Sequence, residues 1–225
     1  MPDTPSYRPA PLFARFYEWN SRRRFFAAQF DPYRRELARM SCGRVLELGA
    51  GGGQNFPYYD PARVSEVEAT EPDGTMLRYL RAHLQDSRVP IHVTEATAEH
   101  LPFDARSFDT VQATLVLCSV GDLGATLAEI ARVLKPDGHL LLLEHVRSPR
   151  RGLAALQTAF TPIQRRVAGN CHLNRDMASA LRDAGYAIET ERRYGGGMFP
   201  LRLYAARPPT VAASQSACAR LILQL

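Results

Sequence analysis

The chain has 225 residues, of which 45% are apolar and 23% charged, and its formal net charge is +5. This length suits one α/β domain, and no apolar run approaches the roughly 20 residues of a membrane-spanning helix. Cys42, Cys118, Cys171 and Cys218 lie far apart, with neither metal-ligand spacing nor the density of a disulfide scaffold, and no signal-peptide pattern is visible. We therefore expect a cytoplasmic protein that holds no metal. The basic excess is almost entirely arginine, which gives little weight to a nucleic-acid partner.

The N-terminal segment is predicted to be helical. Residues 22–40 place aromatic and aliphatic side chains among arginines, the pattern of a helix that packs on a core. We expect residues 1–42 to form a helical lead-in that contributes to a lid. The mixture of arginines and aromatics between residues 15 and 26 fits two interpretations: contact with an anionic lipid surface, or an ordinary solvated helix face.

The next feature is a glycine turn at residues 45–53, VLELGAGGG, which follows a short apolar strand. Glycines at alternate positions let backbone amides approach a ligand closely. A phosphate cradle would continue with Gly-Lys-Ser/Thr, and a dinucleotide fingerprint would place glycine at position 54, where the chain has Gln54. Glu71 closes the following strand about 20 residues beyond the first glycine, where a carboxylate binds a ribose diol. The pattern therefore indicates a nucleoside ligand without a pyrophosphate.

Strand-like and helical segments alternate along the rest of the chain, which predicts a doubly wound parallel α/β sheet. We expect strands at 44–48, 66–70, 91–94, 108–114, 139–146, 186–194 and 199–205, and helices at 74–85 and 123–134. Residues 152–182 are helical in pattern but interrupted at Pro162 and at residues 169–171. They predict a cap, at about residues 150–182, within a main domain spanning 43–207. The tail, residues 208–225, is expected to be poorly ordered.

Four motifs in register carry a resemblance to a known family. VLELGAGGG, EPDGTML, LPFDARSFDTV and EIARVLKPDGHLLLLEHV resemble the class I S-adenosylmethionine-dependent methyltransferases, in particular the methyltransferase type 11 group that includes ubiquinone/menaquinone methyltransferases. NFPYY, LVLCSV, LEHV and GNCHLNRD resemble most the branch of thiol methyltransferases and bacterial phosphatidylethanolamine N-methyltransferases. The resemblance implies a Rossmann-like, doubly wound, mostly parallel seven-stranded sheet with an antiparallel last strand.

The resemblance also implies which residues bind S-adenosylmethionine. Glu47 and the glycine turn would surround the methionine part, Glu71 would take the ribose hydroxyls, and Met76 would pack on the adenine ring. Many members of the family carry Asp where this chain has Thr97, which accepts a hydrogen bond without charge. Met76, Leu115 and Leu117 have a second interpretation as ordinary core residues. The full implied cofactor set is Glu47, Gly49, Ala50, Gly51, Gly53, Asn55, Glu71, Pro72, Met76, Thr97, Ala98, Glu99, Leu115 and Leu117.

The acceptor side is predicted with alternatives. His145 ends an otherwise apolar strand and His172 lies in the cap, so either is a candidate base, although a histidine at a strand end also often binds only backbone. Tyr17 and Trp19 either close over the methyl group or anchor the N-terminal helix. The candidate substrate-binding residues are Tyr17, Trp19, Cys118, His145, Asn174 and Arg175. Cys118 fits an apolar packing role as well, and Asn174 and Arg175 fit a role in holding the cap down.

The sequence therefore predicts methyl transfer to a small-molecule thiol, hydroxyl or amine by a monomer or homodimer with at most peripheral membrane contact. One alternative is a phosphatidylethanolamine N-methyltransferase at a membrane surface. Another is a cofactor-binding protein or non-methylating enzyme that uses only the sulfonium charge. Nucleic-acid methylation is disfavoured because residues 114–117 contain no Asn/Asp-Pro-Pro-aromatic motif.

Overall fold

A seven-stranded sheet forms the centre of the computed structural model, which describes residues 11–209 apart from the side chains of residues 24–27. The strand order is β3-β2-β1-β4-β5-β7-β6. The strands are β1 Gly43–Leu48, β2 Val64–Thr70, β3 Ile91–Thr94, β4 Phe108–Thr114, β5 Leu134–His145, β6 Ala187–Tyr194 and β7 Leu201–Arg207. β7 runs antiparallel to both of its neighbours, β5 and β6, and the other strand pairs are parallel. The predicted mostly parallel sheet with an antiparallel last strand is thus confirmed.

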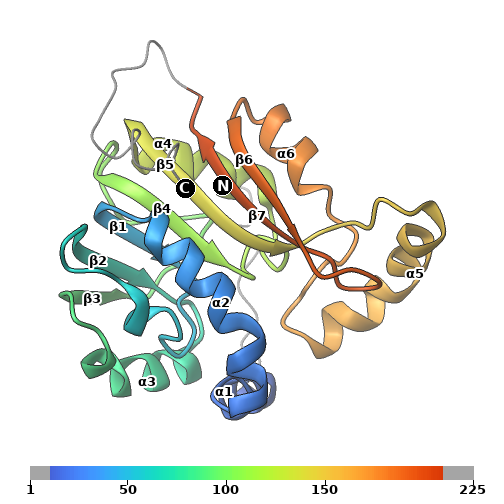
Figure 1. The fold of residues 1–225 in the computed structure, drawn as a ribbon, viewed down its shortest axis with the longest axis horizontal. Helices are drawn as coiled ribbons and strands as arrows, with labels where there is room; N and C mark the ends of the chain where they lie inside the picture. The colour runs from blue at the N-terminus through green and yellow to red at the C-terminus, as the bar shows by residue number, and fades with distance from the viewer. Residues whose placement is uncertain (1–10, 210–225) are drawn as a thin grey trace, which may run out of the picture.

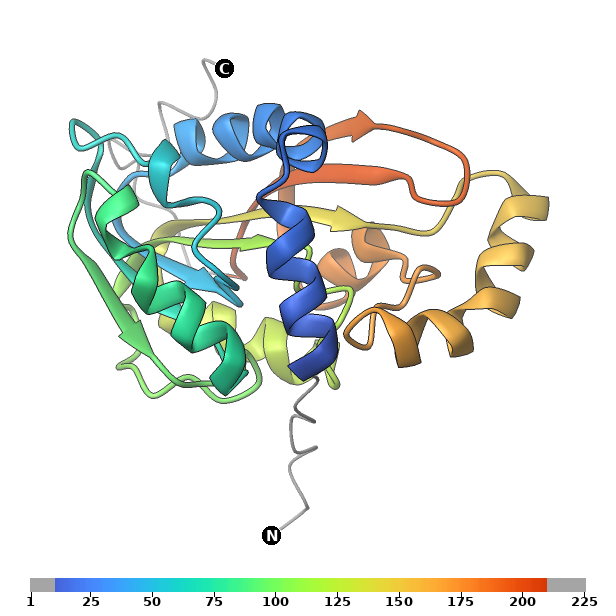
Figure 2. The ribbon, with the colours of Figure 1, turned by 90° about the horizontal axis from the view of Figure 1, so that it is seen from below.

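Helices lie on both faces of this sheet (Figures 1 and 2). They are α1 Pro11–Ser21, α2 Arg24–Met40, α3 Gly74–Ala82, α4 Leu123–Val133, α5 Arg151–Val167 and α6 Met177–Asp183, with short 3-10 turns η1 Phe56–Tyr58 and η2 Leu84–Asp86. Aspartates cap three of them: Asp73 at α3, Asp122 at α4 and Asp176 at α6 accept from backbone N–H groups of the first turn. Figure 1 shows α5 projecting beyond the end of the sheet.

The apolar run in β5 explains why both faces are covered. Successive side chains of a strand point to opposite faces, and residues 140–143 are leucines with no exposed surface. Leu142 belongs to an apolar cluster with Ile130 of α4, whereas Leu143 belongs to one with Leu37 of α2. Burying each leucine stabilises the fold by about 2 kcal/mol. The pattern is that of a central strand buried on both sides.

The predicted interruption at Pro162 is corrected to a bend within one helix: α5 contains Pro162, and Figures 1 and 2 show this helix changing direction part-way along its length. Proline removes one hydrogen bond, to the carbonyl of Thr158, but α5 continues from Arg151 to Val167. Pro162 and Thr158 both lie on the exposed side, so water can satisfy the freed carbonyl. The predicted break at residues 169–171 is present, between α5 and α6.

Most differences in element bounds occur at the ends. β3 and β4 have the predicted bounds, whereas α3 ends at Ala82 instead of residue 85 and is followed by η2. β5 begins at Leu134, which pairs with Phe108, and its register shifts before the pairing of Thr110 with His139. The Lys-Pro-Asp-Gly segment thus forms an irregularity inside the strand.

The predicted tail begins at residue 208, and residues 210–225 lie outside the described part of the chain, as does Cys218. Among the helices of residues 11–209, none has the length and hydropathy needed to cross a membrane.

Candidate functional site

Parallel strands that end at one edge of the sheet bring the candidate site residues together. β1 ends at Leu48, β2 at Thr70, β4 at Thr114 and β5 at His145. The strand order reverses between β1 and β4, and doubly wound sheets bind ligands outside the carboxyl ends of their strands at such a switch point. The glycine turn, Glu71, the loop after β4 and His145 therefore share one edge.

The glycine turn requires glycine for steric reasons. Gly49, Gly51 and Gly53 have φ values of +55°, +60° and +79°, in the left-handed region that side chains rarely adopt. A Cβ on Gly49 would lie 2.8 Å from Cγ2 of Val116, and one on Gly51 would lie 3.3 Å from Cε of Met76. The turn thus packs directly against the loop after β4 and against α3.

Glu71 presents a buried carboxylate beside this turn. Its Oε2 accepts from the Gly51 N–H at 2.9 Å and its Oε1 from the Asp73 N–H at 2.9 Å. Burial raises the pKa of Glu71 to about 7, against the pull of these two hydrogen bonds. The neighbouring candidates fit the same corner: Ala50 is buried and donates its N–H to the end of β2, and Pro72 is half-buried.

Glu47, just before the glycine turn, is the centre of a buried hydrogen-bond network. Its Oε1 accepts from Nδ2 of Asn55 at 2.8 Å and its Oε2 from the Tyr59 hydroxyl at 2.7 Å. Arg34, buried on α2, donates to Oδ1 of Asn55 at 2.9 Å. Burial raises the pKa of Glu47 to about 7. The structure therefore places the predicted residues Glu47 and Asn55 in contact with each other.

The residues predicted around the adenine ring come from two segments. Met76 is buried at the start of α3, next to Gly51. Ala98 is buried and Thr97 is half-buried on the loop after β3. The carboxylate of Glu99 accepts from the Gly121 N–H at 2.8 Å, which ties this loop to the start of α4. Glu99 is thus already engaged with the protein backbone.

Helix α1 lies over the glycine turn (Figure 2). Cε1 of Tyr17 lies 4.0 Å from the position that a Cβ on Gly51 would take. Glu18 is buried and accepts from Nε2 of Gln54 at 2.8 Å, and its Oε2 lies where a Cβ on Gly52 would clash. These contacts place α1 against the glycine turn, and its role as a lid stays a prediction.

The same helix reaches the cap through Phe13 but turns Trp19 outward. A Cβ on Gly169 would lie 2.8 Å from the Phe13 ring. Trp19 is 56% exposed, and the Arg23 guanidinium lies 3.5 Å from its ring centroid. The structure brings Tyr17 to the candidate site and leaves Trp19 on the outside of α1.

The loop after β4, residues 115–120, is fixed by a buried carboxylate of β5. Glu144 has no exposed surface and accepts from the N–H groups of Val116 at 2.9 Å, Leu117 at 2.8 Å and Cys118 at 3.1 Å. Burial raises its pKa. Leu115 has φ +60° and is half-buried, whereas Leu117 is fully buried.

The cap holds the same loop from the other side. The Arg175 guanidinium donates to the carbonyls of Leu117 and Val120, and Nδ2 of Asn170 donates to the Ser119 carbonyl at 2.8 Å. Arg175 thus binds the backbone, which agrees with its alternative interpretation as a residue that holds the cap down. Its role toward a substrate remains a prediction.

Two other predicted residues of the cap also have protein partners. The His172 N–H donates to the Cys118 carbonyl at 2.8 Å, and burial, with the charge of Arg175, lowers the pKa of the imidazole. Nδ2 of Asn174 lies 3.5 Å from the Thr158 hydroxyl of α5. His172 therefore lies beside the loop after β4, while Asn174 faces the helix of the cap.

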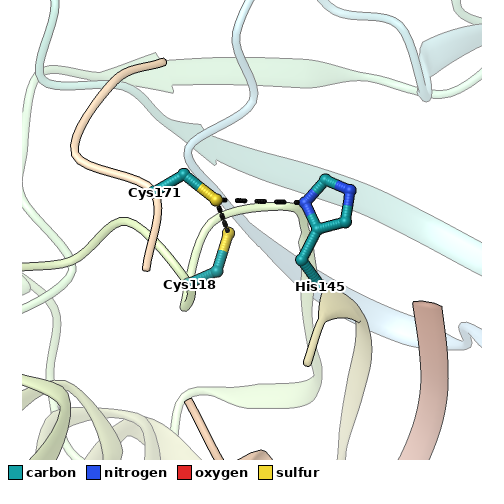
Figure 3. A group of neighbouring side chains, drawn as sticks. All are labelled: Cys118, His145 and Cys171. Atoms are coloured by element: carbon teal, nitrogen blue, oxygen red, sulfur yellow. Dashed lines mark hydrogen bonds between the residues drawn. The ribbon is translucent and has the colours of Figure 1, made fainter. Parts of the chain in front are cut away.

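Cys118, Cys171 and His145 form one group, here called the thiol–imidazole cluster (Figure 3). The two sulfur atoms are 3.6 Å apart, and Sγ of Cys171 lies 4.0 Å from Nδ1 of His145. Their hydrogen bond, together with burial, holds the pKa of Cys118 well above its ordinary value, and the same bond lowers that of Cys171. Burial lowers the pKa of His145, but Cys118 and the charge of Glu144 outweigh it and leave that pKa raised.

Several residues of this region were missed by sequence reasoning. Glu18, Arg34, Glu144 and Asn170 all hold site segments in place through hydrogen bonds. Glu144 could have been identified from the sequence, because an acidic residue inside a strand buried on both faces needs several hydrogen-bond donors. Arg34 is one of many arginines in the predicted N-terminal helix, and no sequence feature distinguishes it.

Comparison with known proteins identifies similarity to methyltransferases. The model of a methyltransferase domain family matches residues 46–142. The chain is 31% identical over 189 residues to thiol S-methyltransferase TMT1B of Rattus norvegicus, covering 80% of this chain and 74% of that protein.

Solved structures share the fold at low sequence identity. A SAM-dependent methyltransferase from Aquifex aeolicus aligns over 89% of this chain and 100% of its own, with a TM-score of 0.64 and 18% identity. The [4+2]-cyclase SpnF aligns over 92% of this chain and 98% of its own, with a TM-score of 0.68 and 15% identity. Likeness at this level establishes the fold, which hosts more than one chemistry.

Proposed function

Because this chain belongs to the class I S-adenosylmethionine-dependent methyltransferases, we propose that it transfers the cofactor's methyl group to the sulfur of a small-molecule thiol. The observation that carries the proposal is the similarity to a thiol S-methyltransferase over 80% of the chain, which includes both the glycine turn and the cap. The loop after β4, which carries Cys118, packs on Gly49 through Val116, and this contact supports an acceptor site adjoining the cofactor.

The residues present fit this cofactor. Glu71 offers a desolvated carboxylate for hydroxyl donors, and the turn of Gly49, Gly51 and Gly53 leaves a cradle that a Cβ would fill. Met76 supplies an apolar surface next to Gly51 for a flat ring. When bound, S-adenosylmethionine supplies a methyl group already activated on a sulfonium.

The chain's own contribution is to position the acceptor, take its proton and exclude water. Tyr17 and Phe13 of α1 span from the glycine turn to the cap and would close the site from above. His145 and His172 both flank the loop that carries Cys118, so each stays a candidate to receive the acceptor's proton. No protein nucleophile is required.

A second candidate, methylation of a phospholipid headgroup, is favoured by the exposed apolar side chains of the cap helix. Leu156, Phe160, Ile163 and Val167 of α5 are all exposed, and α5 also carries arginines. Such a face is suited to an anionic membrane surface. This candidate predicts a headgroup amine as the acceptor.

The test is turnover with methyl-labelled cofactor and three matched acceptors: an aliphatic thiol, a phenol of similar size, and phosphatidylethanolamine vesicles. We expect labelled thioether and an equal amount of S-adenosylhomocysteine with the thiol alone. Label in the phospholipid would replace the thiol proposal with the second candidate. Cofactor binding without any labelled product would contradict both and support a non-methylating protein.

A further inference from the structure

The thiol–imidazole cluster is assembled from three separate segments. Cys118 lies on the loop after β4, His145 is the last residue of β5, and Cys171 lies on the segment between α5 and α6 (Figure 3). The two cysteines are 53 positions apart in sequence, yet all three potential ligand atoms lie within 4.8 Å of one another. In the described residues 11–209, this is the one group of three or more such side chains so placed.

The distances approach those of a tetrahedral metal site. With Zn–S bonds of about 2.3 Å and Zn–N bonds of about 2.05 Å, tetrahedral geometry separates two sulfurs by about 3.8 Å and a sulfur from a nitrogen by about 3.6 Å. The sulfurs of Cys118 and Cys171 are 3.6 Å apart, and Cys171 Sγ lies 4.0 Å from His145 Nδ1. These two distances differ from the tetrahedral values by a few tenths of an ångström. Sγ of Cys118 lies within 4.8 Å of the imidazole ligand atom, so a rotation of the imidazole would bring the three atoms onto one ion.

The segments that carry the ligands are held by independent contacts. Glu144 accepts from three backbone N–H groups of the loop, ending at Cys118. Arg175 and Asn170 hold the same loop through its carbonyls, and they flank Cys171 in sequence. A site whose ligands are fixed by surrounding hydrogen bonds is pre-organised, which distinguishes it from a chance grouping on a surface.

The donor set selects the ion and leaves one position open. Two thiolates and one imidazole favour zinc over magnesium or calcium, which prefer oxygen. Zinc is four-coordinate, and catalytic zinc sites use three protein ligands with water or substrate in the fourth position, including sites with two cysteines and one histidine. Two thiolates, one neutral imidazole and Zn²⁺ have no net charge, which suits a site where Cys118 is 1% and Cys171 5% exposed.

We propose that Cys118, His145 and Cys171 bind a zinc ion, and that its fourth position takes the sulfur of the acceptor thiol. The metal site stands on geometry alone, whereas the role of the fourth position rests on the proposed function. This proposal departs from the sequence prediction of no metal, which was drawn from cysteine spacing along the chain.

The coordination chemistry explains how a thiol is made nucleophilic. A metal-bound His145 no longer serves as the base, so the acceptor thiol displaces water, loses its proton to solvent and remains on the metal as a thiolate. In the transfer step a bond forms between this sulfur and the methyl carbon, and the bond from that carbon to the sulfonium breaks. The electron pair stays on the cofactor sulfur, giving S-adenosylhomocysteine, and the neutral thioether, a weaker ligand, leaves the metal.

Metal content tests the site without any turnover. We expect the reduced full-length protein, loaded with Zn²⁺ and dialysed, to retain one zinc per chain. Cys171→Ser and His145→Ala should bind zinc at least about tenfold less tightly, because loss of even an outer-shell partner costs about 10- to 100-fold. His172→Ala is the matched control: it removes a neighbouring imidazole outside the ligand set and should retain zinc. Binding of S-adenosylhomocysteine verifies that each variant is folded.

Co²⁺ substitution tests the fourth position. Co²⁺ at this site should give thiolate charge-transfer bands and tetrahedral d–d bands, and an aliphatic thiol should shift them while a matched phenol does not. Folded protein that takes up no metal, or loses none in Cys171→Ser and His145→Ala, would overturn the site. Full turnover by zinc-free protein would overturn the metal's role and leave thiol methylation intact. Bands that a thiol leaves unchanged would overturn the fourth-position role, whereas a thiol-dependent shift with no labelled thioether would support the site and contradict the proposed function.

Discussion

The cofactor side and the acceptor side of this molecule are built in different ways. The cofactor side is mostly local: Asn55 and Tyr59 lie 8 and 12 positions after Glu47, just beyond the glycine turn, and Glu71 follows the next strand. The acceptor side is assembled over long range, since the loop after β4 is held by Glu144 of β5 and by Arg175 of the cap. A site built from nearby residues can be recognised as a sequence motif. A site built from distant residues shows no such motif.

The difference matters for function because the two sides adjoin each other, and Nδ2 of Asn55 donates to the Thr114 hydroxyl at the end of β4 at 3.1 Å. Val116, which follows β4, packs on Gly49 of the turn. Helix α1 reaches both sides, with Tyr17 over the turn and Phe13 against the cap at Gly169. Variants on each side should therefore have separable effects on cofactor binding and on acceptor use, unless they disrupt the fold.

Glu144→Ala should have the largest effect, because it removes the support of the acceptor side. Three N–H groups would lose a buried acceptor, and each such loss costs about 1–3 kcal/mol. We expect the free energy of unfolding to fall by about 3 kcal/mol or more, measured by urea denaturation. Glu95→Ala, at an exposed site, is the control and should stay within about 0.5 kcal/mol of the parent. A Glu144 variant as stable as the control would contradict the assignment.

Glu71→Gln should have the next largest effect, confined to the cofactor side. A neutral amide is a weaker acceptor than a carboxylate, and hydrogen bonds to charged groups contribute about 1.5–3 kcal/mol. The dissociation constant of S-adenosylhomocysteine should rise about 10- to 100-fold in calorimetry. Glu66→Gln, at a half-exposed position of β2, the strand that precedes Glu71, should change it by less than about twofold. Equal losses in the two variants would remove Glu71 from the ribose-binding role.

The pH dependence of cofactor binding sharpens the same assignment. Burial raises the pKa of Glu71 to about 7, so the carboxylate becomes protonated as pH falls through that value and accepts hydroxyl hydrogen bonds more weakly. Affinity for S-adenosylhomocysteine should therefore decrease below pH 7, by at most about tenfold per pH unit.

A matched pair of variants identifies the responsible group. Glu47 also has a pKa raised to about 7, but its oxygens bind Asn55 and Tyr59 inside the protein. The pH slope should persist in Glu47→Gln and disappear in Glu71→Gln. The opposite pattern would assign the titration to Glu47.

Phe13→Ala should have the smallest effect. It removes the contact of α1 with the cap at Gly169, so closure over the acceptor should weaken and kcat/KM for a thiol should fall about two- to fivefold. Phe16→Ala is the control: Phe16 lies on the same helix, but its side chain is 60% exposed, so this substitution should leave kcat/KM unchanged. Equal effects of the two substitutions would contradict a specific closing role for Phe13.

The sequence predicted the fold well because the fold depends on local periodicity. The apolar run at residues 140–143 indicated a strand buried on both faces, and α2 and α4 cover it. Pro162 predicted an interruption, whereas α5 bends but continues through it, because on the exposed side of the helix the freed carbonyl of Thr158 can bind water. Exposure of a single residue is set by tertiary packing and cannot be read from a pattern.

The candidate site was predicted unevenly for the same reason. The left-handed backbone at Gly49, Gly51 and Gly53 favours glycine, and the glycines of the motif therefore indicated the turn directly. Cys118 and Cys171 gave no spacing signal, because β5 and the cap bring them together from positions 53 residues apart. Only the fold reveals that their sulfurs are neighbours.

The most direct test of the central claim, separate donor and acceptor sides in one thiol methyltransferase, is a crossed measurement on Glu71→Gln and Cys171→Ser. Affinity for S-adenosylhomocysteine and single-turnover methylation of an aliphatic thiol at saturating cofactor are measured for both. We expect Glu71→Gln to lose cofactor affinity about 10- to 100-fold but keep its saturated rate within about threefold. Cys171→Ser should keep cofactor affinity and lose at least about tenfold in rate. Parallel losses of affinity and rate in both variants would contradict the account.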